Sequence, residues 1–408
     1  MLNERAQTFT FGPGTIDYDP PLITFDAFAI SDFPRCIPMR NGGGKSTLCL
    51  FIAGAIPEAR WATPRLPILL KTSRGAYDDE SLRSVTRVIP QRWEHWWYRR
   101  SVADEVAGVV AQDRDWADHV ITQLQMNKLM LQRPNTLSTG ERKRAMLAVT
   151  LASAPTLLVT DELLVHLDDC WSRVTHDLLQ AYAALGGSHV DFVAGSDASS
   201  ALPDQQDTAK QRRLRTFVDL FVATAASRGG RSDLDVTLRL PYGHQTEVSL
   251  RATSGTAVII TGANGSGKTT LLRELWRKAA RKRGLVVALV ETDPYYQVIG
   301  PTVADEFRRA SSTCLDLAAA AATFKDIDVL TLSYAERKIV AITAACLGSA
   351  DVVAVDELYA GLDPTSAALV NALLKAVCDS GRIVVTTSAL CNEVVLHEIE
   401  NVEHVSLV

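Results

Sequence analysis

A glycine-rich segment in the second half of the chain has the residue types and spacing of a phosphate-binding loop. It reads GANGSGKT at 262–269 and satisfies the pattern GxxxxGK[ST]. Glycines let backbone N–H groups turn inward around phosphate oxygens, and a helix beginning at Lys268 adds its positive N-terminal dipole. Lys268 would neutralise the β- and γ-phosphates, and the Thr269 hydroxyl would hold Mg²⁺. The nucleotide-binding residues expected here are Gly262, Asn264, Gly265, Gly267, Lys268, Thr269 and Thr270.

The first half of the chain carries most of the same pattern in MRNGGGKST at 39–47. Met39 stands where the first glycine belongs. Because glycine tolerates backbone angles that methionine does not, we expect a distortion at the start of this loop. Nucleotide binding is still predicted, through Asn41, Gly42, Gly44, Lys45, Ser46 and Thr47.

The two loops belong to a repeat that organises the whole chain. Residues 137–169 match residues 332–364 at an offset of 195, whereas the loops match at an offset of 223, so the second copy lacks 28 residues between these blocks. In each copy a short apolar run leads into the loop and an amphipathic helix follows it. Continuous apolar strands that alternate with helices indicate a mostly parallel sheet with helices on both faces. The predicted fold class is α/β, with two tandem phosphate-loop domains and a trimmed second copy.

Composition shifts give the expected boundaries. The first domain is predicted at 1–200, and the polar, then basic stretch SDASSALPDQQDTAKQRRLR (196–215) indicates a linker, assigned to 201–233. The second domain is predicted at 234–408, because the alternating run DVTLRL (235–240) is typical of an edge strand.

Composition also limits the classes of function. The 408 residues are 47% hydrophobic and 22% charged, with a formal net charge of −5, which argues against coating nucleic acid by bulk charge. No run approaches 18 apolar residues, and the N-terminus lacks the features of a signal peptide. The seven cysteines are scattered and form no CxxC pair, which favours reduced thiols. We expect a cytoplasmic protein.

These motifs together resemble the ATP-binding cassette (ABC) ATPases, over both copies and most of the chain. The strand ends TLLVTDE (156–162) and DVVAVDE (351–357) are similar to the Walker B motif of that family. The resemblance implies P-loop NTPase domains with a helical subdomain each, and ATP and Mg²⁺ as ligands. It assigns Mg²⁺ support to Asp161 and Asp356, together with Ser46, Thr269 and Gln91, and polarisation of the attacking water to Glu162 and Glu357.

The signature motif of the family, LSGGQ, has an altered counterpart in each copy. LSTGE (137–141) keeps Ser138 and Gly140, whereas LSYAE (332–336) keeps Ser333 but has Tyr334 and Ala335 for the two glycines. The signature of the second copy is therefore expected to be the weaker one.

Two further departures concern the catalytic machinery. Gln91 matches the Q-loop glutamine of the family, but the aligned residue of the second copy is Thr292, and Gln297 follows five residues later. The switch histidine is missing from both copies, where Ser196 and Ser388 stand nearest its position. His189 and His397 are interpreted as ordinary core or surface residues. We therefore expect slow hydrolysis.

Cassettes of this family pair head to tail, so that each ATP lies between one loop and the signature of the other copy. This pairing implies two unequal sites. The more competent one combines the loop around Lys268 with the signature around Ser138, and the other combines the Met39 loop with the signature around Ser333. Tyr18 and Tyr242, 27 and 26 residues before the loop lysines, are candidates for stacking on adenine, with plain surface tyrosines as the alternative.

The segment DPYYQVIGPTVADEF (293–307) is similar to the ATPases of energy-coupling factor (ECF) and cobalt-type importers. The aromatic run QRWEHWWYRR (91–100) is either a core patch of the helical subdomain or the surface that grips a separately encoded membrane permease. The leading hypothesis is an ABC transporter motor subunit, peripheral on the inner face of the cell membrane, with no nucleic acid bound. The alternatives are a soluble ABC protein acting on ribosomes or nucleic acid, or an ATP-binding regulatory or scaffold protein.

Overall fold

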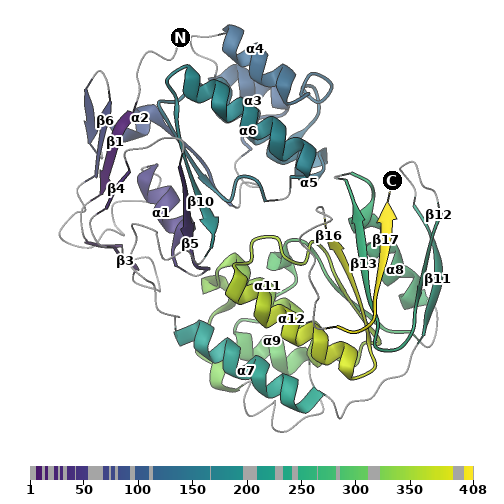
Figure 1. Cartoon of the computed structure of the whole chain (residues 1–408). Coiled ribbons are helices and arrows are strands. Elements are labelled where there is room, and N and C mark those ends of the chain that lie inside the picture. Colours follow the sequence, from purple (N-terminus) through teal and green to yellow (C-terminus); the bar gives the residue numbers. More distant parts are fainter. Residues whose placement is uncertain are drawn as a thin grey trace. The chain divides into compact units, whose positions relative to one another are not determined.

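A computed structural model of the chain divides it into two compact units, Met1–Gln205 and Gln206–Val408 (Figure 1). The structure describes residues 6–11, 14–16, 23–25, 28–30, 35–41, 43–53, 68–72, 75–78, 81–91, 97–109, 114–165, 167–195, 209–225, 233–240, 247–263, 265–281, 285–310, 322–388 and 399–407. In this described part, no helix combines the length and the apolar character needed to cross a membrane.

The first unit is built on a four-stranded parallel sheet in the order β5-β10-β9-β8. A four-stranded antiparallel sheet in the order β4-β1-β6-β7 and the hairpin β2-β3 accompany it. The strands are β1 Ala6–Phe11, β2 Gly14–Ile16, β3 Ile23–Phe25, β4 Phe28–Ile30, β5 Arg35–Met39, β6 Ile68–Thr72, β7 Ala76–Asp78, β8 Thr86–Ile89, β9 Leu157–Asp161 and β10 Ser188–Ala194.

Helices cover both faces of the parallel sheet of the first unit, some in the core that contains Val159 and others in the core that contains Leu158 of the same strand. They are α1 Lys45–Ile52, α2 Leu82–Val85, α3 Val102–Val109, α4 Arg114–Gln123, the 3-10 turn Pro134–Thr136, α5 Thr139–Ala152 and α6 Asp169–Ala184. Helices α3, α4, α5 and α6 share one apolar core with strand residues such as Ile89 and Leu158, and Trp116 and Tyr182 stack within it. This core fixes the start of α5, where the first signature lies.

The second unit has a five-stranded parallel sheet in the order β14-β15-β16-β13-β17 and an antiparallel pair, β11-β12. Its strands are β11 Leu234–Arg239, β12 Glu247–Ala252, β13 Ala257–Gly262, β14 Val287–Val290, β15 Val352–Val355, β16 Ile383–Ser388 and β17 Val402–Leu407. Its helices are α7 Ala209–Ala225, α8 Lys268–Arg281, α9 Val303–Ala310, α11 Tyr334–Leu347 and α12 Pro364–Asp379, with 3-10 turns at Pro294–Tyr296, Ala322–Phe324 and Val329–Thr331.

The two faces of this sheet belong to different cores, because successive side chains of a strand point to opposite faces. Ala257 and Ile259 of β13 join the core under α7, α9, α11 and α12. Val258 and Ile260 join the core under α8, β11 and β12. The α/β prediction, with parallel sheets buried between covering elements, is confirmed.

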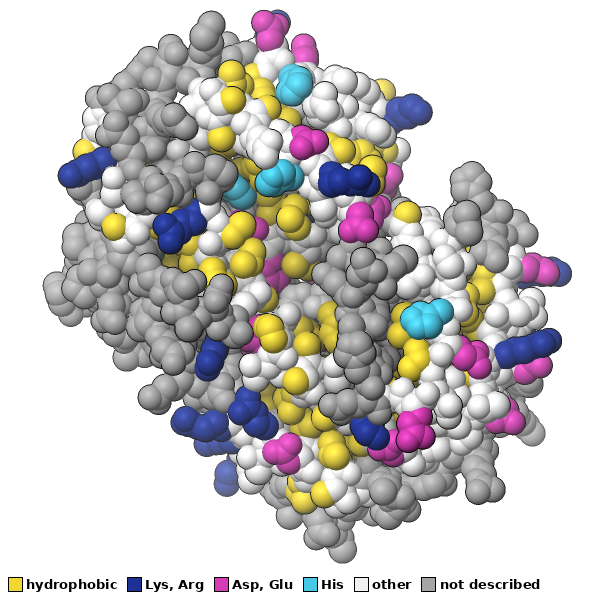
Figure 2. All heavy atoms as spheres, viewed as in Figure 1, with side chains coloured by type: hydrophobic (Ala, Val, Ile, Leu, Met, Phe, Trp, Pro, Cys, Tyr) yellow, Lys and Arg dark blue, Asp and Glu magenta, His cyan; other side chains and the backbone are white. Residues whose placement is uncertain are grey.

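The predicted linker at 201–233 contains a structured helix instead. Helix α7 buries Leu214, Phe217 and Phe221 in the core of the second unit, where the Phe217 ring lies 4.6 Å from that of Phe307. The polar stretch suggested a linker because the exposed basic face of α7 dominates its composition. Figure 2 shows basic side chains gathered over the N-terminal end of this helix, where the exposed residues include Arg212, Arg213 and Arg215.

Candidate nucleotide sites

The phosphate loop of the second unit lies between β13 and α8. Gly265 and Gly267 have φ of 83° and 99°, left-handed angles that favour glycine. Lys268, the first residue of α8, is 6% exposed. Its Nζ donates hydrogen bonds to the carbonyl oxygens of Gly262 at 2.6 Å and Ala263 at 3.0 Å. The ammonium group thus lies within the loop, bound to acceptors that phosphate oxygens can replace.

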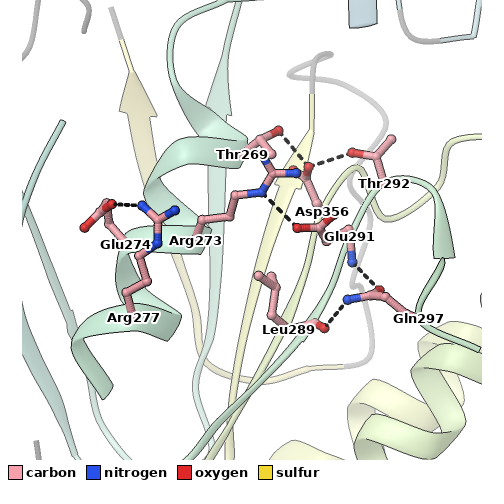
Figure 3. A network of polar contacts seen from close by, with 9 residues as sticks. All are labelled: Thr269, Arg273, Glu274, Arg277, Leu289, Glu291, Thr292, Gln297 and Asp356. Atoms are coloured by element: carbon pink, nitrogen blue, oxygen red, sulfur yellow. Dashed lines mark hydrogen bonds and ion pairs between the residues drawn. The ribbon is translucent and has the colours of Figure 1, made fainter. Parts of the chain in front are cut away.

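The carboxylate of Asp356 accepts hydrogen bonds from hydroxyls on three elements. Thr269 of α8 donates to Oδ2 at 2.7 Å, and Thr292, just after β14, donates to the same oxygen at 2.6 Å (Figure 3). Thr387 of β16 donates to Oδ1 at 2.5 Å. Because parallel strands end at one edge of a sheet, β14, β15 and β16 bring these residues together beside the loop.

This set of oxygens fits Mg²⁺. The ion binds carboxylate and hydroxyl oxygens and usually completes its octahedral shell with waters and substrate phosphates. The described residues include no group of three or more His, Cys, Asp or Glu that could hold a metal ion without such help. At Asp356 and Thr269, a nucleotide bound in the loop would contribute phosphate oxygens to the coordination shell of the ion.

The segment after β14 is held so that Thr292 points at Asp356 (Figure 3). The Glu291 N–H donates to Oε1 of Gln297 at 2.8 Å, and Nε2 of Gln297 donates to the Leu289 carbonyl at 3.0 Å. Arg273 of α8 binds the Glu291 carboxylate at 2.8 Å. The amide of Gln297 is thus bound to the backbone. Thr292, the residue aligned with Gln91 of the first unit, reaches the Asp356 carboxylate instead.

The first unit holds its loop lysine differently. Lys45 is 7% exposed, and its Nζ donates to Asn41 Oδ1 at 2.9 Å and lies 3.2 Å from Oε1 of Glu162. Gln91, which follows β8, donates to the other carboxylate oxygen of Glu162 at 2.9 Å. The side chain of Glu162 is only 1% exposed. The predicted catalytic glutamate of this copy is therefore engaged with the lysine expected to bind phosphate.

Asp161 of the first unit has fewer polar partners than its counterpart. The Ser46 hydroxyl donates to Oδ2, but Oδ1 is buried without a hydrogen-bond partner among the described residues. Thr387 of the second unit corresponds, at the offset of 195, to Phe192, which has no hydroxyl to donate. Burial, followed by the charge of Glu162, raises the pKa of Asp161 to about 6. A buried carboxylate oxygen without a partner is the kind of group that a cation would satisfy, so this site also fits Mg²⁺.

Met39 continues β5 and is 4% exposed, so the expected distortion at the start of the first loop is not present in the strand. A Cβ on Gly262, its counterpart, would lie 2.6 Å from Ser266 Oγ and 2.7 Å from the Leu407 carbonyl of β17. The first loop has Gly43 in place of Ser266. Among the described residues, no strand flanks β5 as β17 flanks β13. Neither obstacle has a counterpart among the described residues of the first unit.

Each signature serine is the N-cap of a long helix. Ser138 precedes α5 and Ser333 precedes α11, and each forms a capping box with the glutamate three residues later. Gly140 lies in the first turn of α5. The hydroxyl of Tyr334 donates to the Thr292 carbonyl at 2.7 Å, so this bulky side chain is bound to the Q-loop segment of its own unit.

The structure describes the two strand ends nearest the expected switch positions as far as Gly195 and Ser388. Ser388, the last residue of β16, is buried, and its counterpart at the offset of 195 is Val193 of β10 rather than Ser196, which lies outside the described residues. His189 lies within the first sheet, with Nε2 2.8 Å from Thr160 Oγ1. Burial lowers its pKa to about 4, as expected of a neutral core histidine.

Several predicted residues lie outside the described part of the chain. Of the aromatic run 91–100, Trp97 packs partly against the helical core and Tyr98 is 82% exposed. The structure therefore divides the visible end of this run between core and surface. The residues named in the sequence analysis that the structure does not describe are Tyr18, Gly42, 92–96, Ser196, Tyr242, Asn264 and His397.

Sequence reasoning assigned no role to Thr387 and aligned Thr292 without giving it one. The pairing of Val355 with Thr386 in β15 and β16 places Thr387 opposite Asp356, and only the sheet register reveals this. The fold of the segment after β14 aims the Thr292 hydroxyl, and no local sequence pattern predicts it.

Comparison with known proteins identifies the family. The sequence profile described as ABC transporter matches residues 40–165. A putative ABC transporter ATP-binding protein of Treponema denticola is 24% identical over 344 residues, covering 69% of this chain and 68% of the relative. The cytochrome c biogenesis ATP-binding export protein of Novosphingobium aromaticivorans is 30% identical over 156 residues, 37% of this chain and 68% of the relative. The energy-coupling factor transporter ATP-binding protein of Bacillus licheniformis is 29% identical over 163 residues, 37% of this chain and 56% of the relative.

Solved structures with a similar fold span most of the chain. The RNase-L inhibitor has a TM-score of 0.54 at 18% identity, covering 86% of this chain and 79% of that protein. A model of ribosome-bound archaeal Pelota and ABCE1 gives a TM-score of 0.59 at 17% identity, over 92% of this chain and 73% of that one. Two loop-and-carboxylate sites on parallel sheets and the named relatives lead to the same conclusion. This chain belongs to the family of ABC ATPases.

Proposed function

We propose that this chain is the ATP-hydrolysing motor subunit of an ABC transporter of the ECF type, with both cassettes on one chain and separately encoded membrane subunits. The observation that carries the proposal is the arrangement at Asp356. A phosphate loop and an Mg²⁺-compatible set of oxygens meet there at one edge of a parallel sheet, and Glu357 follows Asp356 directly in the chain. The names of the relatives from Treponema and Bacillus support the transporter role.

In the second unit, the residues have separate tasks. Lys268 binds the β- and γ-phosphates in exchange for the loop carbonyls, and Thr269 and Asp356 hold Mg²⁺, which supplies charge neutralisation at the phosphates. Glu357 polarises the attacking water. The Thr387 hydroxyl accepts from the Glu357 N–H at 2.8 Å while it donates to Asp356, so one side chain fixes both acids. Positioning of this kind is a large part of catalysis in phosphoryl transfer.

We propose that the two ATP sites are unequal and that each combines the loop of one cassette with the signature of the other. The site with Lys268 and the Ser138 signature is the competent one. The site with Lys45 starts from a closed arrangement, because its lysine must leave Glu162 before it can bind phosphate. We propose cassettes at 1–200 and 234–408, and we assign helix α7, which precedes the second range, to the second cassette.

Hydrolysis by the isolated chain is proposed to be slow. Ser388 and Val193 replace the switch histidine, so neither strand end offers an imidazole to the γ-phosphate. Loss of one preorganised contact to the transition state typically costs on the order of 10²–10³ in rate.

The membrane partner is proposed to contact the region around residues 91–100. Tyr98 is an exposed aromatic residue beside Arg99 and Arg100, which are also exposed. In the second unit, a groove of about 410 Å³ lies between β14, α9 and α11, with small side chains such as Ala310, Ala341 and Ala345 on its walls. Such a groove has room for part of a partner helix. The proposed location of this chain on the inner face of the cell membrane depends on binding to this partner.

A soluble ABC protein without a membrane partner is the second candidate, favoured by the altered switch positions. Steady-state ATP turnover with Mg²⁺ tests the enzymatic part, because the Glu357→Gln variant should bind ATP and lose turnover. Co-purification with a co-expressed permease tests the partner and compares the Trp96→Ala/Trp97→Ala variant with the parent chain. The melting temperatures of the two proteins are measured beside it, and the comparison counts when they are equal. Loss of the permease supports the transporter. Retention by the variant would argue only against residues 91–100 as the contact region, whereas no permease bound by the parent would support the soluble candidate.

A further inference from the structure

Two buried lysines occupy the same place in both units. Lys143 of α5 and Lys338 of α11 each stand five residues after a signature serine, and they are 195 residues apart. Lys143 is 2% exposed and Lys338 is 0% exposed. Lysine is almost never fully buried unless its charge has partners, because removing an ammonium group from water is costly. The repeated burial therefore needs an explanation.

Both lysines bind the main chain of the predicted catalytic glutamate. Nζ of Lys338 donates to the carbonyl oxygen of Glu357 and, at 3.2 Å, to that of Ala360. Nζ of Lys143 donates to the carbonyl oxygen of Glu162 at 3.3 Å. The lysines thus connect the signature helix of each unit with the residue that follows its Walker B aspartate.

The glutamates have an unusual backbone conformation. Glu162 and Glu357 have φ of 56° and 45°, and they are two of only four non-glycine residues with positive φ in the described part of the chain. Such angles are uncommon for residues with a side chain and are maintained only where surrounding contacts enforce them. A charged donor on the carbonyl oxygen of the same residue is such a contact.

We propose that Lys143 and Lys338 are positioning residues that hold these glutamates in the left-handed conformation and so aim their carboxylates. Each lysine also makes the signature helix and the catalytic glutamate of one unit move together. This inference rests on the proposed role of Glu357 as the residue that polarises water.

The test compares Lys338→Met with Lys338→Gln in a Lys45→Ala background, so that turnover reports the Lys268 site. Methionine has similar length but neither charge nor donor, whereas glutamine keeps a donor. We expect Lys338→Met to lower kcat roughly 10- to 100-fold, as misplacement of a catalytic group does, with KM and nucleotide affinity changed less than about twofold. Lys338→Gln should recover part of the loss.

Arg337→Met is the matched control. Arg337 is also a buried cation of α11, but its guanidinium donates to the Val329 carbonyl at 2.7 Å and lies over the Tyr295 ring. Its loss should lower the melting temperature and leave kcat within about twofold. Equal kcat losses in Arg337→Met and Lys338→Met would overturn the inference, since any buried cation would then have the same effect.

A double-mutant cycle separates this inference from the proposed function. In single-turnover measurements, Lys338→Met should have no further effect in a Glu357→Gln background, because the lysine acts through that carboxylate. If Glu357→Gln alone keeps full turnover, the proposed function is wrong. If Glu357→Gln loses turnover but Lys338→Met keeps it, or lowers it equally in both backgrounds, only the positioning role is wrong. Should Lys338→Met not fold, the Lys338→Gln arm of the cycle decides in the same way.

Discussion

The two units carry the same loop and the same Asp-Glu pair but surround them with different partners. In the second unit, three hydroxyls donate to Asp356, and Lys268 is bound by carbonyls of its own loop. In the first unit, Lys45 is bound by Glu162, and one oxygen of Asp161 has no hydrogen-bond partner among the described residues. The comparison teaches that a motif specifies where the charges stand, whereas neighbouring residues decide what must be displaced before a ligand binds.

One substitution accounts for part of this difference. Thr387 bridges Asp356 and the Glu357 N–H, whereas the aligned Phe192 is 0% exposed and packs in the apolar core. The first unit has exchanged a polar support of its acidic pair for hydrophobic packing. Such a change stabilises the sheet at the expense of preorganisation at the site.

The largest expected effect separates the two loop lysines. Lys268→Ala should lower ATP turnover on the order of 10²–10³-fold, because it removes a preorganised cation at the site with complete polar support. Lys45→Ala should mainly weaken nucleotide binding. Steady-state rates at saturating ATP provide the measurement, and a greater loss of turnover in Lys45→Ala would reverse the assignment of the competent site.

A side chain at the first position of the loop should be tolerated less well in the second unit than in the first, which has Met39 there. Gly262→Met places atoms against the Leu407 carbonyl and Ser266, and overpacking of this kind typically costs 1–3 kcal/mol, so nucleotide affinity should fall about tenfold. Ser266→Gly in the same chain should restore part of the affinity, because the first unit combines Met39 with Gly43. Titration of a fluorescent ATP analogue would measure both, and an unimpaired single variant would show that the loop tolerates the contact.

Removal of the Thr292 hydroxyl should affect the metal more than the nucleotide. Thr292→Val loses the hydrogen bond to Asp356, and changes around a metal site commonly cost 10- to 100-fold in metal affinity. We expect the Mg²⁺ concentration for half-maximal nucleotide binding to rise roughly tenfold. Thr292→Ser is the control and should behave as the parent. An equal loss of affinity with and without Mg²⁺ would contradict a role in the metal site.

Neutralising Glu162 should increase the nucleotide affinity of the first site. Glu162→Gln removes the charge that holds Lys45 at 3.2 Å, so Lys45 becomes available to phosphate. In a Lys268→Ala background, nucleotide affinity should rise roughly threefold to tenfold, which corresponds to about 1 kcal/mol. Equilibrium binding without turnover gives the answer. A decrease would mean that the ion pair supports the loop instead of competing with the ligand.

The smallest expected effect concerns a buried acid that only the first unit has. Burial raises the pKa of Asp191 to about 7, whereas the aligned residue of the second unit is Thr386. The folded state therefore binds this proton more readily than the unfolded state, whose Asp has a pKa near 3.8. Asp191 should raise the stability of the first unit by slightly less than about 1 kcal/mol between pH 8 and pH 6.5. His189, whose pKa falls from 6.5 to about 4 on folding, should offset about half of this gain over the same range.

Tryptophan fluorescence can follow this effect, because six of the seven tryptophans precede residue 205 and only Trp276 follows it. Asp191→Asn keeps one acceptor oxygen, which suffices because Thr160 and Leu163 both donate to Oδ1, but it has no titrating group. The pH dependence of the melting temperature should therefore flatten in that variant. The same slope in variant and parent would assign the titration to another group.

Much of the fold and of the sites could be predicted because their signals are local. The loop pattern at 262–269, the strand ends at Asp161 and Asp356, and the signature serines occupy the expected elements. The linker assignment over 209–225 failed because an amphipathic helix with a strongly basic exposed face resembles a polar connection in composition. Only packing against α12 reveals that its apolar face belongs to a core.

The sequence by itself determined the family, the duplication and the positions of the loop lysines and acidic pairs, since these depend on residue type and spacing along the chain. Tertiary structure decided which hydroxyl reaches Asp356, why Met39 is tolerated, and that Lys338 binds the Glu357 carbonyl. These contacts join residues 19 to 145 positions apart on different elements. Their geometry follows from sheet register and helix packing, which no local pattern encodes.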